Sequence, residues 1–481
     1  MPPWRAPRSS PRAREPGAHV GVEYVVVATH GVLEPSPLRR RFTVHPSQVI
    51  VFGFALADLI GAGLLSLPIS SRSGEWTNLV DALFTSTSAV CVTGLTTLDT
   101  ATHWSGFGLV VIMLLIQVGG LGIMIFAALI GLTLARKLTV RSRVNTAAQA
   151  NVAGYEDVRG LVRNIVLISL VIEALTFCFL FPRFILGYGY SVGDAAWNAL
   201  FHSVSSFNNA GFALYSDNLI GFAADPWICL PICGAIILGG LGFPVIMQLR
   251  KELRRPLHWS MNTRLVLVGS AVLLVAGTVY ITVLEWANPA TLGAYDPAAR
   301  VLIGFFHSVQ TRTAGFNSVD IGLMRDETWV GMDVLMFIGG GPAGTAGGIK
   351  VTTFAVLFFI MLAELRGEGA VNVFGKRLSR AVHRQAITVV LIAVAAVMTG
   401  TVGLMLITGL PFDRVFFEAV SAFGTVGLTT GITYDLPDAA ELILVALMFL
   451  GRLGPLTLGT AIALRRRQIL FEYPMERPAI G

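Results

Sequence analysis

The sequence predicts an all-α membrane protein in which four tandem helix/pore-helix/helix repeats, with eight transmembrane helices in total, lie in a pseudo-fourfold arrangement around one axis. Two observations lead to this fold class. The 481 residues are 54% hydrophobic and 13% charged, with a mean hydropathy of +0.69, which is far from a soluble domain. In addition, one glycine-containing unit occurs four times. The net charge is +6, but the cations gather at the ends of apolar segments, so we expect a lipid bilayer and no nucleic acid as partner.

The repeated unit is marked by a glycine that is followed by Leu or Phe. The four marker glycines are separated by 117, 104 and 112 residues, so the period is nearly regular and fills the chain. A Phe lies ten positions before each marker, and a glycine cluster follows each marker 24 to 28 residues later. Four copies of one unit indicate pseudo-fourfold symmetry. The markers are Gly94, Gly211, Gly315 and Gly427, and the phenylalanines are Phe84, Phe201, Phe305 and Phe417.

Residues 1–47 are predicted to form a basic, largely disordered cytoplasmic arm, because they are rich in Pro, Arg, Ser and Gly. The apolar piece at 20–33 contains Glu23 and His30 and lacks a clean cleavage site, so we expect no signal peptide. An alternative is that the true start lies further along the chain and part of this arm is never made. Residues 48–481 are expected to form a single transmembrane domain.

Each repeat has an incoming span, a short pore helix, a loop and an outgoing span. The spans have about the 20 residues that cross a bilayer. Every outgoing span ends in Arg or Lys, so we expect all repeats to have the same orientation in the membrane. The protein is then a multi-pass protein of the cell membrane with both termini in the cytoplasm. The repeats cover about 48–143, 161–255, 264–366 and 385–467. Incoming spans are predicted at 48–69, 161–181, 264–284 and 385–409, pore helices at 78–90, 193–206, 298–310 and 412–423, and outgoing spans at 105–134, 227–249, 329–365 and 442–464.

The four loops that contain the markers predict an ion pathway. The stretch 423–431, for example, is too polar and rich in glycine to cross a bilayer, and irregular backbone at that depth occurs only where protein buries it or where it lines a water-filled path. A Thr-Val-Gly run with inward carbonyl groups is typical of a cation filter, in which backbone oxygens replace the hydration shell of the ion. The expected filter residues are Val92, Thr93, Gly94, Asn209, Ala210, Gly211, Thr313, Ala314, Gly315, Thr425, Val426 and Gly427.

The third outgoing span is the only one that we expect to be broken. Ten consecutive residues there contain six glycines and a proline, which excludes a helix. Our hypothesis is a movable plug below the loops. The alternative, close helix packing through small residues, is adequate for the glycine clusters of the first and second repeats. The expected gate residues are Gly339, Gly340, Gly341, Pro342, Ala343, Gly344, Thr345, Ala346, Gly347, Gly348 and, from the fourth repeat, Arg452.

Arg452 stands where the other repeats carry small or apolar residues. A charge buried in a membrane faces a partner, a cavity or a pathway, so we expect Arg452 to face the pore and oppose cations; the alternative is that it caps the glycine-rich stretch. Arg312 is expected to brace the backbone of the third loop, and His202 and His307 to form hydrogen bonds behind the pore helices. Asp58, within the first span, is expected to lie among neighbouring helices rather than to act on the ion.

No enzyme signature is present in the sequence. A nucleophile, a base and an orienting group do not converge, and no phosphate-binding loop appears. Cys229 and Cys233 lie one helical turn apart without His or further Cys partners, which favours buried small hydrophobic residues over a metal site or a disulfide.

From residue 47 onward the chain resembles the bacterial Trk/Ktr/HKT potassium transporters, most closely the Ktr membrane subunit. The resemblance implies potassium uptake, with K+ and possibly Na+ as the transported ion and no covalently bound cofactor. It also implies a homodimer in the membrane and a cytoplasmic ring of nucleotide-binding regulatory subunits. It also implies that the third-repeat loop and the fourth-repeat Arg form the gate. Gly341 and Ala343 replace serines that are usual in the family, and Gly94 favours potassium over sodium. The matching stretches are 90–95, 207–212, 311–317, 345–350, 421–428 and 449–455.

Two alternatives remain at this point. The first is a sodium-coupled or sodium-permeable cation transporter. The second, from a different class, is a secondary solute transporter, which would bind its solute at a site built from broken helices and would often contain inverted repeats. The parallel repeats and the single expected break argue against this second alternative.

Overall fold

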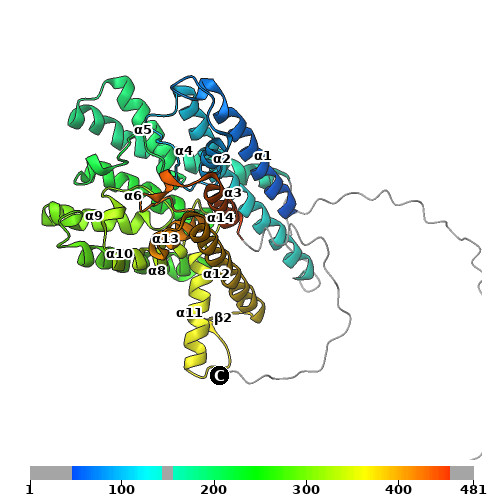
Figure 1. The fold of residues 1–481 in the computed structure, drawn as a ribbon. Coiled ribbons are helices and arrows are strands. Elements are labelled where there is room, and N and C mark those ends of the chain that lie inside the picture. Colours follow the sequence, from blue (N-terminus) through cyan, green and yellow to red (C-terminus); the bar gives the residue numbers. More distant parts are fainter. Residues whose placement is uncertain (1–45, 143–154, 455–481) are drawn as a thin grey trace, which may run out of the picture. The chain divides into compact units, whose positions relative to one another are not determined.

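The computed structural model describes residues 46–142 and 155–454 and is almost entirely helical (Figure 1). The predicted arm at 1–47, apart from the two residues that begin α1, and the predicted end of the last span beyond 454 lie outside the described residues. The helices are α1 (Pro46–Ser66), α2 (Leu79–Val90), α3 (Gly106–Ser142), α4 (Tyr155–Tyr188), α5 (Val192–Phe207), α6 (Pro226–Leu241), α7 (Phe243–Glu252), α8 (Met261–Glu285), α9 (Pro297–Gln310), α10 (Asp326–Phe337), α11 (Val351–Leu365), α12 (Arg380–Thr408), α13 (Phe412–Gly424) and α14 (Asp438–Leu453).

The four predicted short helices are present as α2, α5, α9 and α13, within one residue of their predicted ends. Local chemistry explains where two of them begin. The Asn78 side chain accepts a hydrogen bond from the Val80 N–H, and the Ser191 side chain accepts one from the Asp194 N–H, so both residues cap exposed N–H groups at a helix start. Each short helix packs against the incoming helix of its own repeat, namely α1, α4, α8 and α12.

A buried phenylalanine anchors each short helix. Phe84, Phe201 and Phe417, each ten positions before its marker, are fully buried. In the third repeat Phe306 is fully buried, whereas Phe305, at the ten-residue spacing, is only partly buried. The third repeat is therefore offset by one residue relative to the others.

Five helices of the described part are long and apolar enough to cross a membrane: α1, α3, α4, α8 and α12. A sixth span results if α6 and α7 are counted together. The third outgoing segment consists of α10 and α11, which have 12 and 15 residues, and α14 has 16 residues. The total of eight spans stays a prediction.

The second outgoing segment is broken, which corrects the prediction of one continuous span at 227–249. Helix α6 ends at Leu241, α7 begins at Phe243, and the two helices are bent by 98°. Gly242 between them has a φ of +91°, and Pro244 lacks the N–H that a continuing helix needs. A Cβ at Gly242 would collide with the carbonyl oxygen of Pro342. The expectation of a single broken span is therefore wrong.

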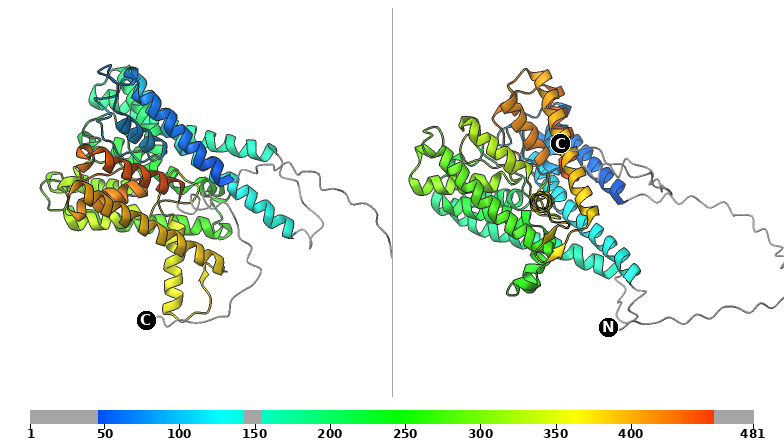
Figure 2. Two further views of the ribbon diagram at one scale, coloured as in Figure 1. Left: turned by 45° about the vertical axis from the view of Figure 1, so that its right-hand side comes forward. Right: turned by 90° about the horizontal axis from the view of Figure 1, so that it is seen from below.

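A small β-hairpin that the sequence did not predict joins α11 to α12. Strands β1 (Asn372–Val373) and β2 (Lys376–Arg377) pair in antiparallel fashion. Phe374 and Gly375 between them both have positive φ, +48° and +74°, which is the backbone of a two-residue hairpin turn. Figure 2 shows α11 and this hairpin, in yellow, extending away from the other helices.

Small residues allow the first outgoing helix to approach the first short helix, as predicted. A Cβ built on Gly119 of α3 would lie less than 3.0 Å from the carbonyl of Val90, whereas the nearest atoms to one on Gly122 belong to the Phe54 ring at 3.8 Å. A methyl group forced into a packed contact, as at Gly119, lowers the free energy of unfolding by about 1–3 kcal/mol. In an open helical position, as at Gly122, alanine instead raises it by at most about 1 kcal/mol relative to glycine.

We therefore expect Gly119→Ala to lower the melting temperature of the purified protein. Gly122→Ala, in the same helix, serves as the matched control and is expected to leave it unchanged or slightly higher. Thermal melting in detergent measures both variants. Equal melting temperatures would contradict the close approach at Gly119.

Candidate ion pathway

The four marker glycines lie in loops with one shared backbone geometry. Each marker has a positive φ, between +70° and +94°, and the residue two positions earlier also has a positive φ, between +50° and +74°. For a residue other than glycine this is uncommon. The same rare conformation in four places shows that the repeat extends to the backbone. The earlier residues are Val92, Asn209, Thr313 and Thr425.

The four loops contact one another in a closed cycle. A Cβ added to any marker would lie less than 3.0 Å from a backbone carbonyl oxygen of the next loop. Only glycine fits so close to a neighbouring backbone. The contacts run from Gly94 to Ala210, from Gly211 to Ala314, from Gly315 to Val426 and from Gly427 back to Thr93. The structure thus brings together all twelve residues predicted to line the pathway.

Hydrogen bonds from the short helices fix the loops. The Ser88 hydroxyl accepts from the N–H of Gly94 at 3.0 Å, and the Ser421 hydroxyl accepts from the N–H of Gly427 at 3.1 Å. In contrast, the buried hydroxyl oxygens of Thr93, Thr313 and Thr425 have no hydrogen bond partner among the described residues.

Side chains of the short helices also hold the chain just beyond three of the loops. The residue three positions after the marker donates its N–H to a short-helix side chain in each case. Leu214 donates to His202 Nε2 at 3.4 Å, and Ser318 donates to His307 Nε2 at 3.4 Å. Both histidines thus form hydrogen bonds as predicted.

In the fourth repeat Glu418 accepts the corresponding hydrogen bond, at the position that His202 has in the second repeat. The sequence did not reveal this role, because a carboxylate replaces the imidazole at the repeated position. The Glu418 side chain is fully buried. Oε1 accepts from the Thr430 N–H at 3.0 Å and from the Thr429 hydroxyl, and Oε2 accepts from the Thr433 hydroxyl at 3.0 Å. One carboxylate therefore supports the whole segment after Gly427.

We expect Glu418→Ala to reduce ion flux and the melting temperature strongly, because three donors lose their acceptor and each of the two buried ones, at Thr430 and Thr433, costs about 1–3 kcal/mol when unsatisfied. Glu418→Gln keeps one acceptor oxygen and is expected to lie between the wild type and Glu418→Ala in both measurements. The flux assay is rubidium uptake by proteoliposomes. Equal losses in the two variants would show that the acceptor oxygens are not what matters.

A polar cavity opens on one side of the cycle, and the empty space within it and at its open mouth is about 1030 Å³. Its lining includes Gly94, Gly211 and Gly427, and the carboxylates of Asp99, Asp217 and Asp320. Burial raises the pKa of Asp99, but hydrogen bonds from Ser216, Ala101 and Thr102 outweigh this effect and lower the pKa below its ordinary value. A charged carboxylate at this mouth attracts cations.

The glycine-rich segment, residues 338–350, lies against the other side of the cycle. It is not helical, which confirms the predicted break between α10 and α11. The Thr345 hydroxyl donates to Asn209 Oδ1 at 2.9 Å. A Cβ on Gly347 would collide with the side chain of Thr425. The segment therefore contacts the second and fourth loops at the residues with positive φ.

Three cationic side chains hold this segment through its carbonyl oxygens. Arg452, which is 3% exposed, donates to the carbonyl of Thr345 and, at 3.1 Å, to that of Gly119. Lys350, which the sequence analysis did not single out, donates to the carbonyl of Ala346 at 2.5 Å. Such contacts satisfy carbonyl groups that a broken helix leaves unpaired.

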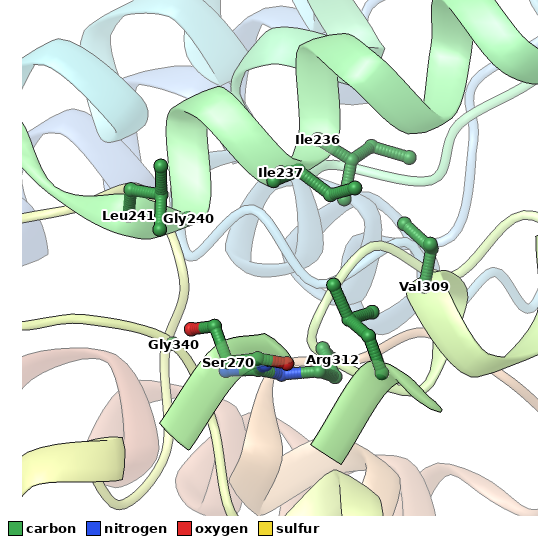
Figure 3. A pocket seen from close by; sticks show the side chains of 9 residues that line it. Ile236, Ile237, Gly240, Leu241, Ser270, Val309, Arg312 and Gly340 are labelled. Atoms are coloured by element: carbon green, nitrogen blue, oxygen red, sulfur yellow. The ribbon is translucent and has the colours of Figure 1, made fainter. Parts of the chain in front are cut away.

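Arg312 is the third cation, and its partners differ from the expected ones. It donates to the carbonyl of Ser270 in α8 at 3.1 Å and to that of Gly339 at 3.2 Å. Figure 3 shows Arg312 beside a small cavity that Ser270 and Gly340 also line. Arg312 thus braces the start of the glycine-rich segment rather than the backbone of its own loop.

Other candidates have structural partners. Asp58 Oδ2 accepts from the Thr87 hydroxyl at 2.8 Å, so this carboxylate lies among helices as expected. Cys229 and Cys233 are buried and free. In the described part of the chain no group of three or more His, Cys, Asp or Glu side chains could hold a metal ion.

Comparisons with known proteins agree with this architecture. The TrkH family, described as cation transport protein, matches residues 41–470. Ktr system potassium uptake protein B of Bacillus subtilis (strain 168) is 41% identical over 435 residues, which cover 90% of this chain and 96% of that protein. The protein of the same name from Vibrio alginolyticus is 38% identical, with coverage of 90% and 94%. Potassium/sodium uptake protein NtpJ of Enterococcus hirae is 35% identical, with coverage of 92% and 99%.

The crystal structure of the potassium transporter TrkH from Vibrio parahaemolyticus has the same fold, with a TM-score of 0.68 at 18% identity and coverage of 89% of this chain and 86% of that chain. The apolar helices and these matches define a membrane transport protein and not an enzyme. The chain belongs to the TrkH family of cation transport proteins. The predicted resemblance to the Trk/Ktr group is confirmed.

Proposed function

We propose that this protein takes up potassium ions across the cell membrane through a selectivity filter formed by the four marker loops. The closed cycle of contacts between the loops is the observation that carries the proposal. Four loops that touch around one centre can offer backbone carbonyl oxygens from all sides, and such oxygens replace the hydration shell of a cation. The free hydroxyl oxygens of Thr93, Thr313 and Thr425 add further oxygen ligands.

The fold that goes with this function is a single domain, 48–481, of four repeats in a pseudo-fourfold arrangement with eight spanning helices. The mouth with Asp99 faces outside, and both termini are cytoplasmic. The basic ends of the outgoing segments, such as Arg250 and Lys251 in the last turn of α7, support this orientation.

In this mechanism the glycine-rich segment and Arg452 form a gate directly below the filter. The contacts of the segment with Asn209 and Thr425 support its place on the ion path. An uncompensated guanidinium there repels cations by Coulomb's law. Transport requires the segment and Arg452 to move aside. The alternative role of Arg452, as a cap for the segment, uses the same hydrogen bond to Thr345.

The names of two relatives support a partner protein for this chain. Both relatives are named as parts of a Ktr system, which supports a membrane subunit that works with a regulatory subunit. We include in the proposal a homodimer in the membrane and a cytoplasmic nucleotide-binding ring that moves the glycine-rich segment.

A second candidate is sodium-coupled or sodium-permeable transport. It is favoured by the similarity to a relative whose name includes both potassium and sodium. A secondary solute transporter would fit the two broken helices, but the family is one of cation transport proteins.

The test combines growth and flux. We expect the full-length chain to restore growth of potassium-uptake-deficient cells at low potassium, and proteoliposomes to accumulate rubidium. Sodium added to the same vesicles separates the two candidates, because coupling makes rubidium uptake depend on sodium. Failure of both growth and uptake by correctly folded protein would refute potassium transport.

A further inference from the structure

A third cavity, unrelated to the polar mouth, lies between α10, α11, α12 and α13. It is open to its surroundings, the empty space including that opening is about 1520 Å³, and its lining is largely apolar. Several of the lining side chains lie on the outer surface of the helix bundle: Val330 is 64% exposed, Val394 44% and Met398 43%. Because these exposed side chains are apolar, a hydrophobic ligand dissolved in the bilayer has access to this cavity from the outer surface of the bundle.

Asp333 of α10 lines this apolar cavity. The residue is only 8% exposed, and its Oδ1 has no hydrogen bond partner among the described residues. Trp329 and Phe337 lie one helical turn before and after it on the same face of α10, and both line the cavity. A carboxylate on an otherwise apolar wall attracts a cation through its charge.

The remaining charges of the cavity have the same sign. Asp326 and Asp413, in the first turns of α10 and α13, line it as well, and no Lys, Arg or His occurs among the described residues of its lining. A buried carboxylate without a partner is costly, and an ammonium group would offset this cost. We propose that this cavity binds an amphiphilic amine from the membrane, with its ammonium group at Asp333 and its hydrocarbon part along the apolar wall.

A bound amine would also act on transport, and this part rests on the proposed function. Ile338 and Ile349, near the two ends of the glycine-rich segment, both line the cavity. The backbone pairs there, because the Gly339 N–H donates to the Ile349 carbonyl at 2.7 Å. Val420 of α13, next to the loop-supporting Ser421, lines it too. An occupant holds both ends of the segment in the arrangement described here and therefore inhibits ion flux.

The experiment uses n-octylamine, an ammonium ion at neutral pH, and n-octanol as the uncharged probe of equal chain length. Binding to the full-length purified protein is measured by the rise in melting temperature, a readout that does not depend on transport. We expect octylammonium to bind about tenfold more tightly than octanol, the effect of one additional charged contact. Asp333→Asn is expected to abolish this difference.

Two further variants make the binding test specific. Asp58→Asn changes another buried carboxylate, which has Thr87 as a partner and lies outside the cavity, and is expected to keep the preference for the amine. Val394→Trp fills the cavity from its exposed side and is expected to weaken binding of both probes, even if Asp333→Asn does not fold. An unchanged preference in Asp333→Asn, or equal binding of both probes by the wild type, would overturn the proposal.

Rubidium flux then tests the coupling to transport. Octylammonium is expected to inhibit the wild type and to have little effect on Asp333→Asn. Equal inhibition of both would mean that the amine blocks the ion pathway itself, and the coupling would be refuted. Vesicles without any amine show separately whether the protein transports rubidium, so a failure of the proposed function is distinguishable from a failure of the amine site.

Discussion

Replacing Gly315 with alanine is expected to reduce rubidium flux by more than about tenfold, which corresponds to an increase of the free-energy barrier to transport by about 1.4 kcal/mol or more. The new Cβ would collide with the carbonyl oxygen of Val426 and push it out of the position from which it can bind the ion. Because the loops contact one another in a cycle, this displacement also alters the fourth loop. Rubidium uptake by proteoliposomes, with sodium as the competing ion, measures both the loss of flux and the loss of selectivity.

Gly74→Ala provides a matched control for this prediction. Gly74 has a φ of +74°, close to the +81° of Gly315, so both alanines have a similar backbone strain. No atom lies within 4 Å of a Cβ at Gly74. The control is therefore expected to keep normal flux. If both variants transport equally well, the contact between the third and fourth loops does not define the ion path.

Replacing Arg452 with alanine is expected to increase rubidium flux by about tenfold or more, since removing one charge from the ion path lowers the barrier by more than about 1.4 kcal/mol. The variant also loses the hydrogen bond to the carbonyl of Thr345, so the glycine-rich segment is held less firmly. Flux is measured at several rubidium concentrations, because a repulsive barrier also changes the dependence on ion concentration.

Arg300→Ala is the control for the loss of carbonyl contacts. Arg300 also donates to backbone carbonyls only, those of Tyr295, Trp286 and Gly293, outside the ion path. Its replacement is expected to leave flux unchanged. Unchanged flux in Arg452→Ala would rule out the barrier, and a fall in flux together with melting temperature would identify Arg452 as a cap of the segment.

The short helices were predictable because local chemistry defines their ends. Asn78 and Ser191 supply caps, and a glycine in the left-handed region follows soon after each helix ends. The loops were predictable from the fourfold recurrence of one pattern. The signal for the helix ends lies within a short stretch of the chain, whereas the signal for the loops is the repetition of such a stretch along the chain.

The break at Gly242 was missed because the first and second repeats share the same letters, Gly-Gly-Leu-Gly. The difference lies in the next residues. Ile123 and Met124 follow the first cluster, and α3 continues, whereas Phe243 and Pro244 follow the second and the helix ends. A proline two positions after a glycine was the available signal.

The partners of buried polar groups could not be predicted from the sequence. Arg312 donates to Ser270 and Gly339, which lie 42 and 27 residues away. Such pairs depend on how distant helices meet, and no local pattern specifies them. The same holds for the contact between Arg452 and Thr345, 107 residues apart.

The bend between α6 and α7 has a mechanical consequence. The Phe243 N–H, at the first residue of α7, donates to the carbonyl of Ala343 at 3.1 Å, and the N–H of Gly341 donates to the carbonyl of Gly240 at 2.7 Å. The first bond joins the start of α7 to the glycine-rich segment, and the second joins the end of α6 to it. If the segment is the proposed gate, a displacement of α7 at its basic end would be transmitted to the segment through the Phe243 bond.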